Sequence, residues 1–234
     1  MRSTRNPGRS AGLLYILMGI PAPFALLYLP GKLIVPGNAA ATADKIAASE
    51  TLFRLGIAAQ LFSQILFVYL VLVLYDLFAG VDRRQASLMK ALVLVSVPIG
   101  LVNEVSSVAA LNLVRGADFL SAVGKPQRDA LAMLFVKMHG SGIAISQIFW
   151  GLWLLPLGLL VYRSGFIPRV FGVLLLVNGV AYPILSLVYF LAPQYGPVAA
   201  RFAMLPETGE LWFMLWLLIK GAVPPPVVRD PALG

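Results

Sequence analysis

Six runs of apolar residues divide the chain, and charged residues gather in the short segments between them. A helix of about 20 apolar residues crosses the roughly 30 Å hydrocarbon core of a bilayer, because each residue adds about 1.5 Å. We therefore predict an all-α polytopic membrane protein, a bundle of six transmembrane helices in one integral membrane domain over residues 1–234. The predicted spans cover residues 11–29, 50–78, 88–113, 131–161, 170–191 and 206–223.

The longest clear run is uncharged from Gly140 to Tyr162 and is stopped by Arg163. It follows His139, the only histidine of the chain. Apolar residues at helical spacing precede it, and Pro126 suits the first turn of a helix. The fourth helix is therefore expected to extend well outside the bilayer, unless Gly140-Ser141-Gly142 breaks it.

The first run, residues 11–29, allows two readings. A basic start and the Pro21-Ala22-Pro23 sequence fit a signal peptide, but about 19 apolar residues exceed the roughly 7–15 of a typical signal core. We predict a retained helix that kinks at the prolines, which requires neighbours to satisfy the freed carbonyls. After it, Asn38 or Thr42 is expected to cap a helix running on into the second span.

Composition excludes a soluble globular fold. The chain is 59% hydrophobic and 12% charged, whereas soluble domains carry about 25% charged residues. The absence of cysteine excludes disulfides and thiolate metal sites. The net charge of +8 comes from residues between apolar runs, so orientation and anionic lipid headgroups explain it better than nucleic acid.

The distribution of basic residues predicts the orientation. With six spans, ten Lys and Arg residues fall on the side of the termini and eight on the other side. The ten lie in short connections close to the spans, where positive charge favours the cytoplasm. Both termini are therefore predicted to be cytoplasmic. Pro224-Pro225-Pro226 is expected to end the last helix.

Three segments of the chain carry a family resemblance: Arg9–Tyr15, Phe149–Gly158 and, most specifically, Tyr162–Arg169 with the sequence YRSGFIPR. The chain resembles the bacterial domain-of-unknown-function 4386 family of small multipass membrane proteins. The resemblance implies a six-helix bundle in the bacterial cytoplasmic (inner) membrane. It implies no activity, substrate, cofactor or catalytic residue.

Polar residues inside the spans recur at one depth. Counted from the cytoplasmic end of its own span, each lies about 18–21 Å into the membrane. The residues at this depth are Gln64, Glu104, Gln147, Tyr182 and Glu210. We predict that they form a polar layer in the outer half of the bundle. The candidate polar cluster comprises Glu104, Glu210, Gln64, Gln147, Tyr182, His139, Arg54 and Asn103.

Glu104 is the most informative member. A carboxylate at the centre of a membrane helix costs about 2.5–3.5 kcal/mol on insertion scales, so Glu104 is expected to face the bundle and pair with Arg54, Lys137 or His139. A structural reading stands beside the functional one: the glutamines then only bond helices together, and Glu210 only caps the first turn of the sixth helix.

Three functions remain open on this basis. The first is binding or transport of a small molecule, ion or lipid through the polar layer. The second is a non-catalytic membrane partner or structural protein, whose polar layer locks the bundle. The third is an intramembrane lipid-modifying enzyme using Glu104, Glu210 and His139, although no His-Glu-x-x-His spacing is present. We assign no catalytic residue, metal or cofactor, and the sequence predicts no oligomeric state.

Overall fold

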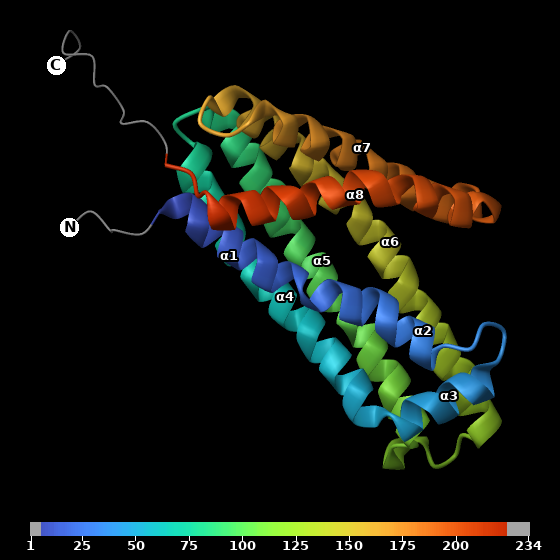
Figure 1. Ribbon diagram of the computed structural model, residues 1–234. Helices are drawn as coiled ribbons and strands as arrows, with labels where there is room; N and C mark the ends of the chain where they lie inside the picture. Colours follow the sequence, from blue (N-terminus) through green and yellow to red (C-terminus); the bar gives the residue numbers. More distant parts are fainter. Residues whose placement is uncertain (1–5, 224–234) are drawn as a thin grey trace, which may run out of the picture. The chain divides into compact units, whose positions relative to one another are not determined.

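The computed structural model describes residues 6–223, with side chains for all of these except 203–207, and every regular element in that range is helical (Figure 1). The helices are α1 (Pro7–Gly19), α2 (Leu29–Leu33), α3 (Ala39–Ala48), α4 (Glu50–Phe78), α5 (Arg83–Arg115), α6 (Lys125–Ser164), α7 (Arg169–Leu191) and α8 (Gly196–Ile219). A π-helix covers Pro23–Tyr28, and 3₁₀ turns cover Asp118–Leu120 and Pro193–Tyr195.

Five helical segments of the described chain are long and apolar enough to span a membrane. They are Pro7–Leu33, Glu50–Phe78, Arg83–Arg115, Lys125–Ser164 and Arg169–Leu191. The apolar part of α8, Thr208–Ile219, is shorter. Length and composition therefore support five spans, one fewer than the predicted six.

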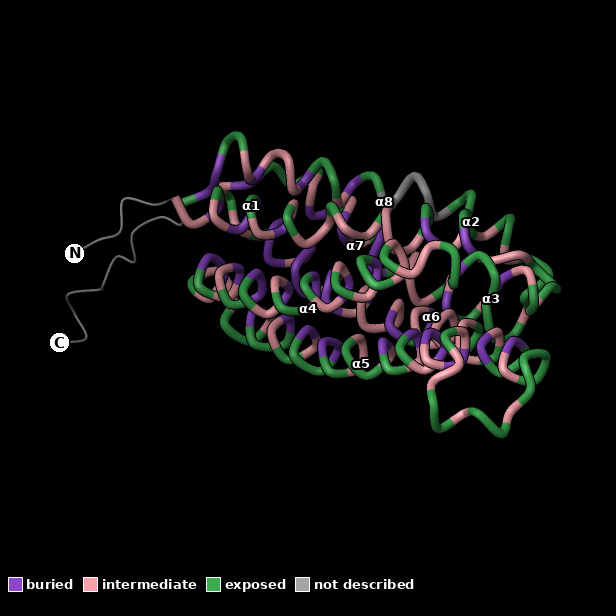
Figure 2. The backbone as a smooth tube through the Cα atoms, turned by 90° about the horizontal axis from the view of Figure 1, so that it is seen from below, coloured by how far each residue is buried: buried purple, intermediate pink, exposed green. Residues whose placement is uncertain are grey.

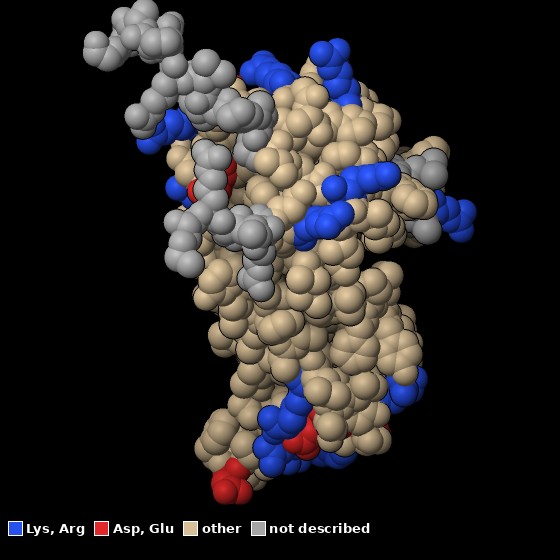
Figure 3. All heavy atoms as spheres, turned by 60° about the vertical axis from the view of Figure 1, so that its left-hand side comes forward, with Lys and Arg blue, Asp and Glu red and all other residues tan. Residues whose placement is uncertain are grey.

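The outer faces of these helices are apolar, as expected in lipid. On α7, the exposed side chains recur every three or four residues, and examples are Val177 (50% exposed), Ile184 (51%) and Leu187 (54%). Figure 2 shows buried and exposed positions alternating along the helical turns. Most of the surface visible in Figure 3 is uncharged, and Lys and Arg gather in a few places. Contact with lipid explains why the outward face of these helices is apolar, as well as the buried face.

The first span is interrupted where the sequence predicts it. Helix α1 ends at Gly19, and the chain enters a π-helix at Pro23 before α2 continues to Leu33. Proline supplies no backbone donor, and a neighbouring helix makes a polar contact nearby: the Ser63 hydroxyl of α4 donates to the Met18 carbonyl over 3.0 Å.

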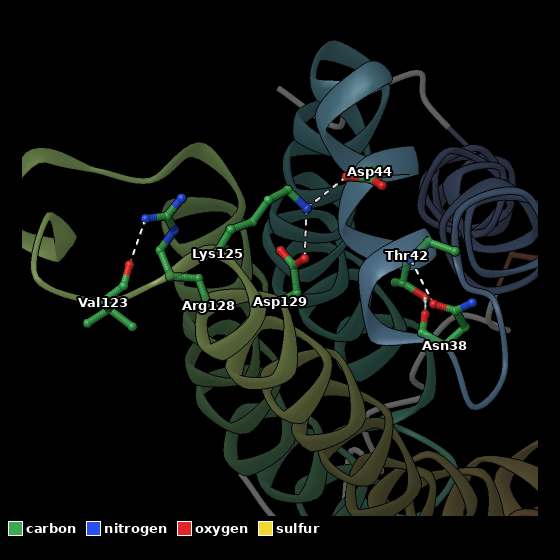
Figure 4. A network of polar contacts seen from close by, with 8 residues as sticks. Asn38, Thr42, Asp44, Val123, Lys125, Arg128 and Asp129 are labelled. Carbon is green, nitrogen blue, oxygen red and sulfur yellow. Dashed lines mark hydrogen bonds and ion pairs between the residues drawn. The ribbon is translucent and has the colours of Figure 1, made fainter.

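Asn38 caps a helix, but that helix does not run on into the second span. Its Oδ1 accepts from the Ala41 amide at 2.9 Å, and Thr42 bonds back to the Asn38 carbonyl (Figure 4). Helix α3 ends at Ala48 because Ser49 leaves the helical region, with φ −128° and ψ 37°. Helix α4 then begins at Glu50.

Two other helices differ from simple expectations. Helix α6 continues through Gly140-Ser141-Gly142 without a break. Helix α8 begins at Gly196, with a proline in its first turn, rather than at Pro206, and it ends at Ile219. Gly221, at φ +73°, follows that end. The expected stop at residues 224–226 lies outside the described residues.

The chain divides into two compact units. Unit 1 contains the described parts of residues 1–16, 69–93 and 148–234, and unit 2 contains residues 17–68 and 94–147. In unit 2, buried Leu29, Leu33, Ile46 and Leu111 form an apolar cluster. At the start of α6 in the same unit, Lys125 contacts Asp44 at 3.0 Å and Asp129 at 2.7 Å (Figure 4).

Glycines bring the helices of unit 1 together. Helices α7 and α8 lie side by side (Figure 1). On α6 and α7, Gly151 lies against Gly179 and Gly158 against Gly172. The two pairs are seven residues apart and run in opposite directions, as antiparallel helices require. Small residues at this spacing allow backbones in a membrane to approach closely.

Candidate functional site

Glu104 is a buried carboxyl in unit 2. It lies on α5, is 5% exposed, and its Oε1 is 3.7 Å from Nδ1 of His139 on α6. The imidazole is itself 24% exposed. Because both groups are ionisable, the pair can exist as two neutral groups or as an ion pair, and a single proton decides between them.

The same imidazole nitrogen faces two further polar groups from α5. Asn103 Nδ2 is 3.2 Å from His139 Nδ1 and also donates to the His139 carbonyl at 3.1 Å. Ser107 Oγ is 3.1 Å from Nδ1. An unprotonated Nδ1 accepts a hydrogen bond from the amide or the hydroxyl, whereas a protonated one donates to the hydroxyl or the carboxylate. The cluster therefore accommodates either protonation state.

A glycine of α6 makes this contact between helices possible. The Asn103 side chain lies against Gly142, where an added Cβ would overlap it. The Gly140-Ser141-Gly142 sequence therefore serves as a close-contact point rather than as a helix break. Asn103 occupies the space that a side chain would take, and this contact orients its amide toward His139.

Gln64 approaches the same part of α5 from α4. It is 9% exposed, and its Oε1 has no hydrogen-bond partner among the described residues. An added Cβ on Gly100 would lie 3.0 Å from this oxygen. Gly100 is one turn before Glu104, and helical side chains lean toward the amino terminus. The Glu104 carboxyl thus leans toward the turn that Gln64 covers.

Unit 1 contains a second carboxyl cluster. Glu210 of α8 accepts hydrogen bonds from the Tyr15 hydroxyl at Oε1 and from Asn178 Nδ2 at Oε2, the latter over 2.9 Å. Tyr15 and Asn178 are both fully buried. The Tyr15 ring packs 5.8 Å from that of Trp153. Asn178 Oδ1 has no hydrogen-bond partner within the described part of the chain.

The predicted cluster is divided between the two units. Unit 2 holds Gln64, Asn103, Glu104, His139, Arg54 and Gln147, and unit 1 holds Tyr182 and Glu210. Gln147 is half-buried, and Tyr182 stacks edge-on with Trp150 at 6.1 Å between ring centroids.

The structure narrows one expectation about partners and corrects another. Of the three candidates for Glu104, the structure brings His139 to the carboxyl, while Arg54 bonds to Glu50 at 2.8 Å one helical turn away. Glu210 does not cap a first turn, because α8 begins at Gly196 and Glu210 lies well inside it.

Sequence reasoning missed Tyr15, which is the partner of Glu210. A tyrosine in an apolar span is not distinctive by itself, since its ring also suits lipid or the membrane interface. Glycines opposite the polar residues, Gly100 and Gly142, were the other missed signal. Among the described residues, no three His, Asp or Glu side chains gather as a metal site would need.

The apolar exposed helices and the buried polar residues within them define a multispan helical membrane protein. A family model described as "Domain of unknown function (DUF4386)" matches residues 10–221, and the chain belongs to this family. The resemblance predicted from the sequence is thus confirmed.

One relative among the curated proteins matches part of the chain. An uncharacterized protein from Archaeoglobus fulgidus is 34% identical over 87 residues, which cover 37% of this chain and 51% of that protein. The chain therefore spans about half the length of this relative. No solved structure matches the chain significantly.

Proposed function

We propose that this protein binds or transports a small molecule, ion or lipid at the Glu104–His139 cluster, defined as Glu104, His139, Asn103 and Ser107 of unit 2. The observation that carries the proposal is the approach of a buried carboxyl to a single ionisable partner, at 3.7 Å. Ionisable groups inside a membrane are costly to hold there, so they mark pathways and ligand sites.

The partners of Glu104 distinguish it from a structural carboxyl. A purely structural carboxyl is best served by fixed neutral donors, because these hold one protonation state. Histidine is the side chain whose unperturbed charge changes near neutral pH, and two α5 side chains contact Nδ1 of His139 at 3.1 and 3.2 Å. This arrangement tolerates the arrival and departure of charge, as a binding or transport site requires.

The proposal includes the membrane arrangement. We infer six spans in one integral domain, with the apolar end of α8 as the sixth, and both termini on the cytoplasmic side of a bacterial inner membrane. The five long apolar helices support this arrangement, together with the Lys and Arg residues near the span ends on the side of the termini.

A second candidate function is that of a non-catalytic membrane partner. The Tyr15–Glu210–Asn178 cluster favours it, because neutral donors serve both carboxyl oxygens in a fully buried setting. Such a cluster locks helices together. Under this alternative, Glu104 would do the same in unit 2, and replacing it would change stability alone.

Thermal unfolding of the detergent-purified protein tests the proposal, with its four tryptophans as the fluorescent signal. A panel of small cations, anions, neutral solutes and lipids is compared for wild type, Glu104→Gln and, as the matched control, Glu210→Gln. We expect at least one compound to stabilise wild type and Glu210→Gln but not Glu104→Gln. Equal stabilisation of all three proteins by every active compound would contradict the proposal.

A further inference from the structure

We infer that the ligand of this site is a small cation that donates hydrogen bonds, of the ammonium type, and that Gln64 Oε1 and the Glu104 carboxylate receive it. The inference rests on the proposed function and narrows it to one chemical class. Its basis is the set of acceptors that α4, α5 and α6 bring together in unit 2.

The first observation is the orphaned acceptor on α4. Gln64 is nine-tenths buried, and its Oε1 has no hydrogen-bond partner among the described residues. Leaving a buried acceptor unpaired is unfavourable, and more so in hydrocarbon, where water is absent. A donor supplied by a ligand removes this cost.

The second observation is the neighbourhood of that acceptor. Gln64 lies against Gly100, and Glu104 leans toward this turn from one turn further along α5. His139 Nδ1 lies 3.7 Å from the carboxyl on the α6 side. A carboxylate only accepts hydrogen bonds, and an unprotonated imidazole nitrogen also accepts. The imidazole nitrogen already faces Asn103 Nδ2 and Ser107 Oγ. Gln64 Oε1 and the Glu104 carboxylate therefore call for a donor, and the carboxylate calls for positive charge.

The basic side chains of unit 2 leave this position to a ligand. Arg54 and Arg115 pair with Glu50, at 2.8 and 3.5 Å, and Lys125 pairs with Asp44 and Asp129. Lys137, two residues before His139 on α6, is exposed. Apart from His139, no basic side chain of the described residues forms an ion pair with Glu104.

The donor set also favours N–H over a metal ion. Hard metal cations take about six or more oxygen ligands, whereas Gln64 and Glu104 offer the oxygens here, beside the imidazole of His139. The Asn103 amide nitrogen, itself a donor, also points to that imidazole. A primary ammonium has three N–H donors, enough for the amide oxygen of Gln64 and the carboxylate of Glu104. A hydrated proton shares this chemistry, and it would come from the solvent rather than from a solute.

The test uses the full-length chain in detergent, with methylammonium chloride as the probe. Tetramethylammonium chloride and sodium chloride at equal ionic strength are the controls, because they carry the charge without an N–H. We expect methylammonium alone to raise the unfolding temperature of wild type. The shift is expected to vanish in Glu104→Gln and to require about tenfold more methylammonium in Gln64→Leu, the equivalent of one hydrogen bond.

A second variant, Gln64→Glu, tests the same position if Gln64→Leu folds poorly. Gln64→Glu retains an acceptor at this position and should keep or strengthen the methylammonium response. Equal stabilisation by tetramethylammonium or sodium would overturn the inference, as would a response that Gln64→Leu and Gln64→Glu leave unchanged.

The remaining outcomes separate the ligand class from the function. If methylammonium does not change the unfolding temperature, but a fall in pH raises it for wild type and not for Glu104→Gln, the donor cation is the proton. If only an anion or a neutral solute acts through Glu104, the inference fails and the proposed function stands. If no compound and no pH change acts through Glu104, both fail.

Discussion

The two carboxyl clusters of this protein show how partners decide what a buried glutamate does. In unit 1, Glu210 receives hydrogen bonds from a tyrosine hydroxyl and an asparagine amide, both fully buried. In unit 2, Glu104 faces an imidazole that is partly exposed. Two neutral donors hold the Glu210 carboxyl, whereas Glu104 has an ionisable partner beside the neutral hydroxyl of Ser107. The residue type is the same, and the difference lies in the neighbouring helices.

The glycines of α6 also have different neighbours in the two units. On α6, Gly151 of unit 1 lies against the Gly179 carbonyl and the Pro183 ring, which belong to α7. Gly142 of unit 2 lies against the side chain of Asn103. A backbone cannot move aside for an added methyl group, but a side chain can rotate. Unit 1 is thus tightly constrained along α6, and unit 2 has room to adjust.

The largest expected effect comes from Gly151→Ala. The added methyl group would overlap α7, and such overpacking typically costs about 1–3 kcal/mol. We expect the unfolding temperature to fall and the yield of monodisperse protein to drop. Gly142→Ala is the matched control and should fold with a smaller loss, because Asn103 can turn away. An equal loss in both variants would remove the contrast between the units.

Tyr15→Phe should have the next largest effect. It removes a hydrogen bond to a buried carboxyl and keeps the ring, so it should cost about 1.5–2 kcal/mol of stability. Thermal unfolding measures the loss, and ligand responses mediated by Glu104 should be unchanged. A variant as stable as wild type would show that the Glu210 cluster does not lock unit 1.

Glu104→Gln should cost little stability. The amide keeps the shape of the side chain and still bonds to neighbouring groups, so the expected change is about 1 kcal/mol or less. The same variant is expected to lose its response to ligand. A large loss of stability would show that Glu104, like Glu210, holds the helices together.

Ser107→Ala should have the smallest effect. It removes the contact to His139 Nδ1, at 3.1 Å, and the hydrogen bond of the hydroxyl to Glu104, while Asn103 keeps its own contact to His139. Hydrogen bonds between membrane helices are worth about 0.6 kcal/mol on average, so the unfolding temperature should fall only slightly. Ser107→Thr, which keeps the hydroxyl, is the control and should behave as wild type.

Hydropathy predicted the all-helical class and several helix ends because runs of apolar residues and charge are local signals. Helix α4 covers Glu50–Phe78, the residues of the second predicted span. The predicted sixth span starts at residue 206, which is a proline, but α8 already begins at Gly196. A proline in a membrane protein does not necessarily end a helix, since neighbours can satisfy the freed groups.

The partners within the site were harder to predict. Depth along a helix follows from counting residues, but the direction in which a residue faces does not. Apolar residues surround these helices on all sides, so the pattern does not reveal the inner face. Glu104 had three candidate partners in the sequence, and only the fold brings His139 to it. Tyr15 reaches Glu210 through a fold that no local pattern encodes.

The widened turn at Pro23–Tyr28 gives the first helix a weak point. Pro21 and Pro23 cannot donate to the backbone, and the Ser63 hydroxyl holds only one carbonyl nearby. Amide deuteration should therefore proceed faster from Ile20 to Leu27 than in the middle of α4, even inside a lipid nanodisc. The same break follows the Met18 carbonyl, which is held by Ser63, the residue that precedes Gln64.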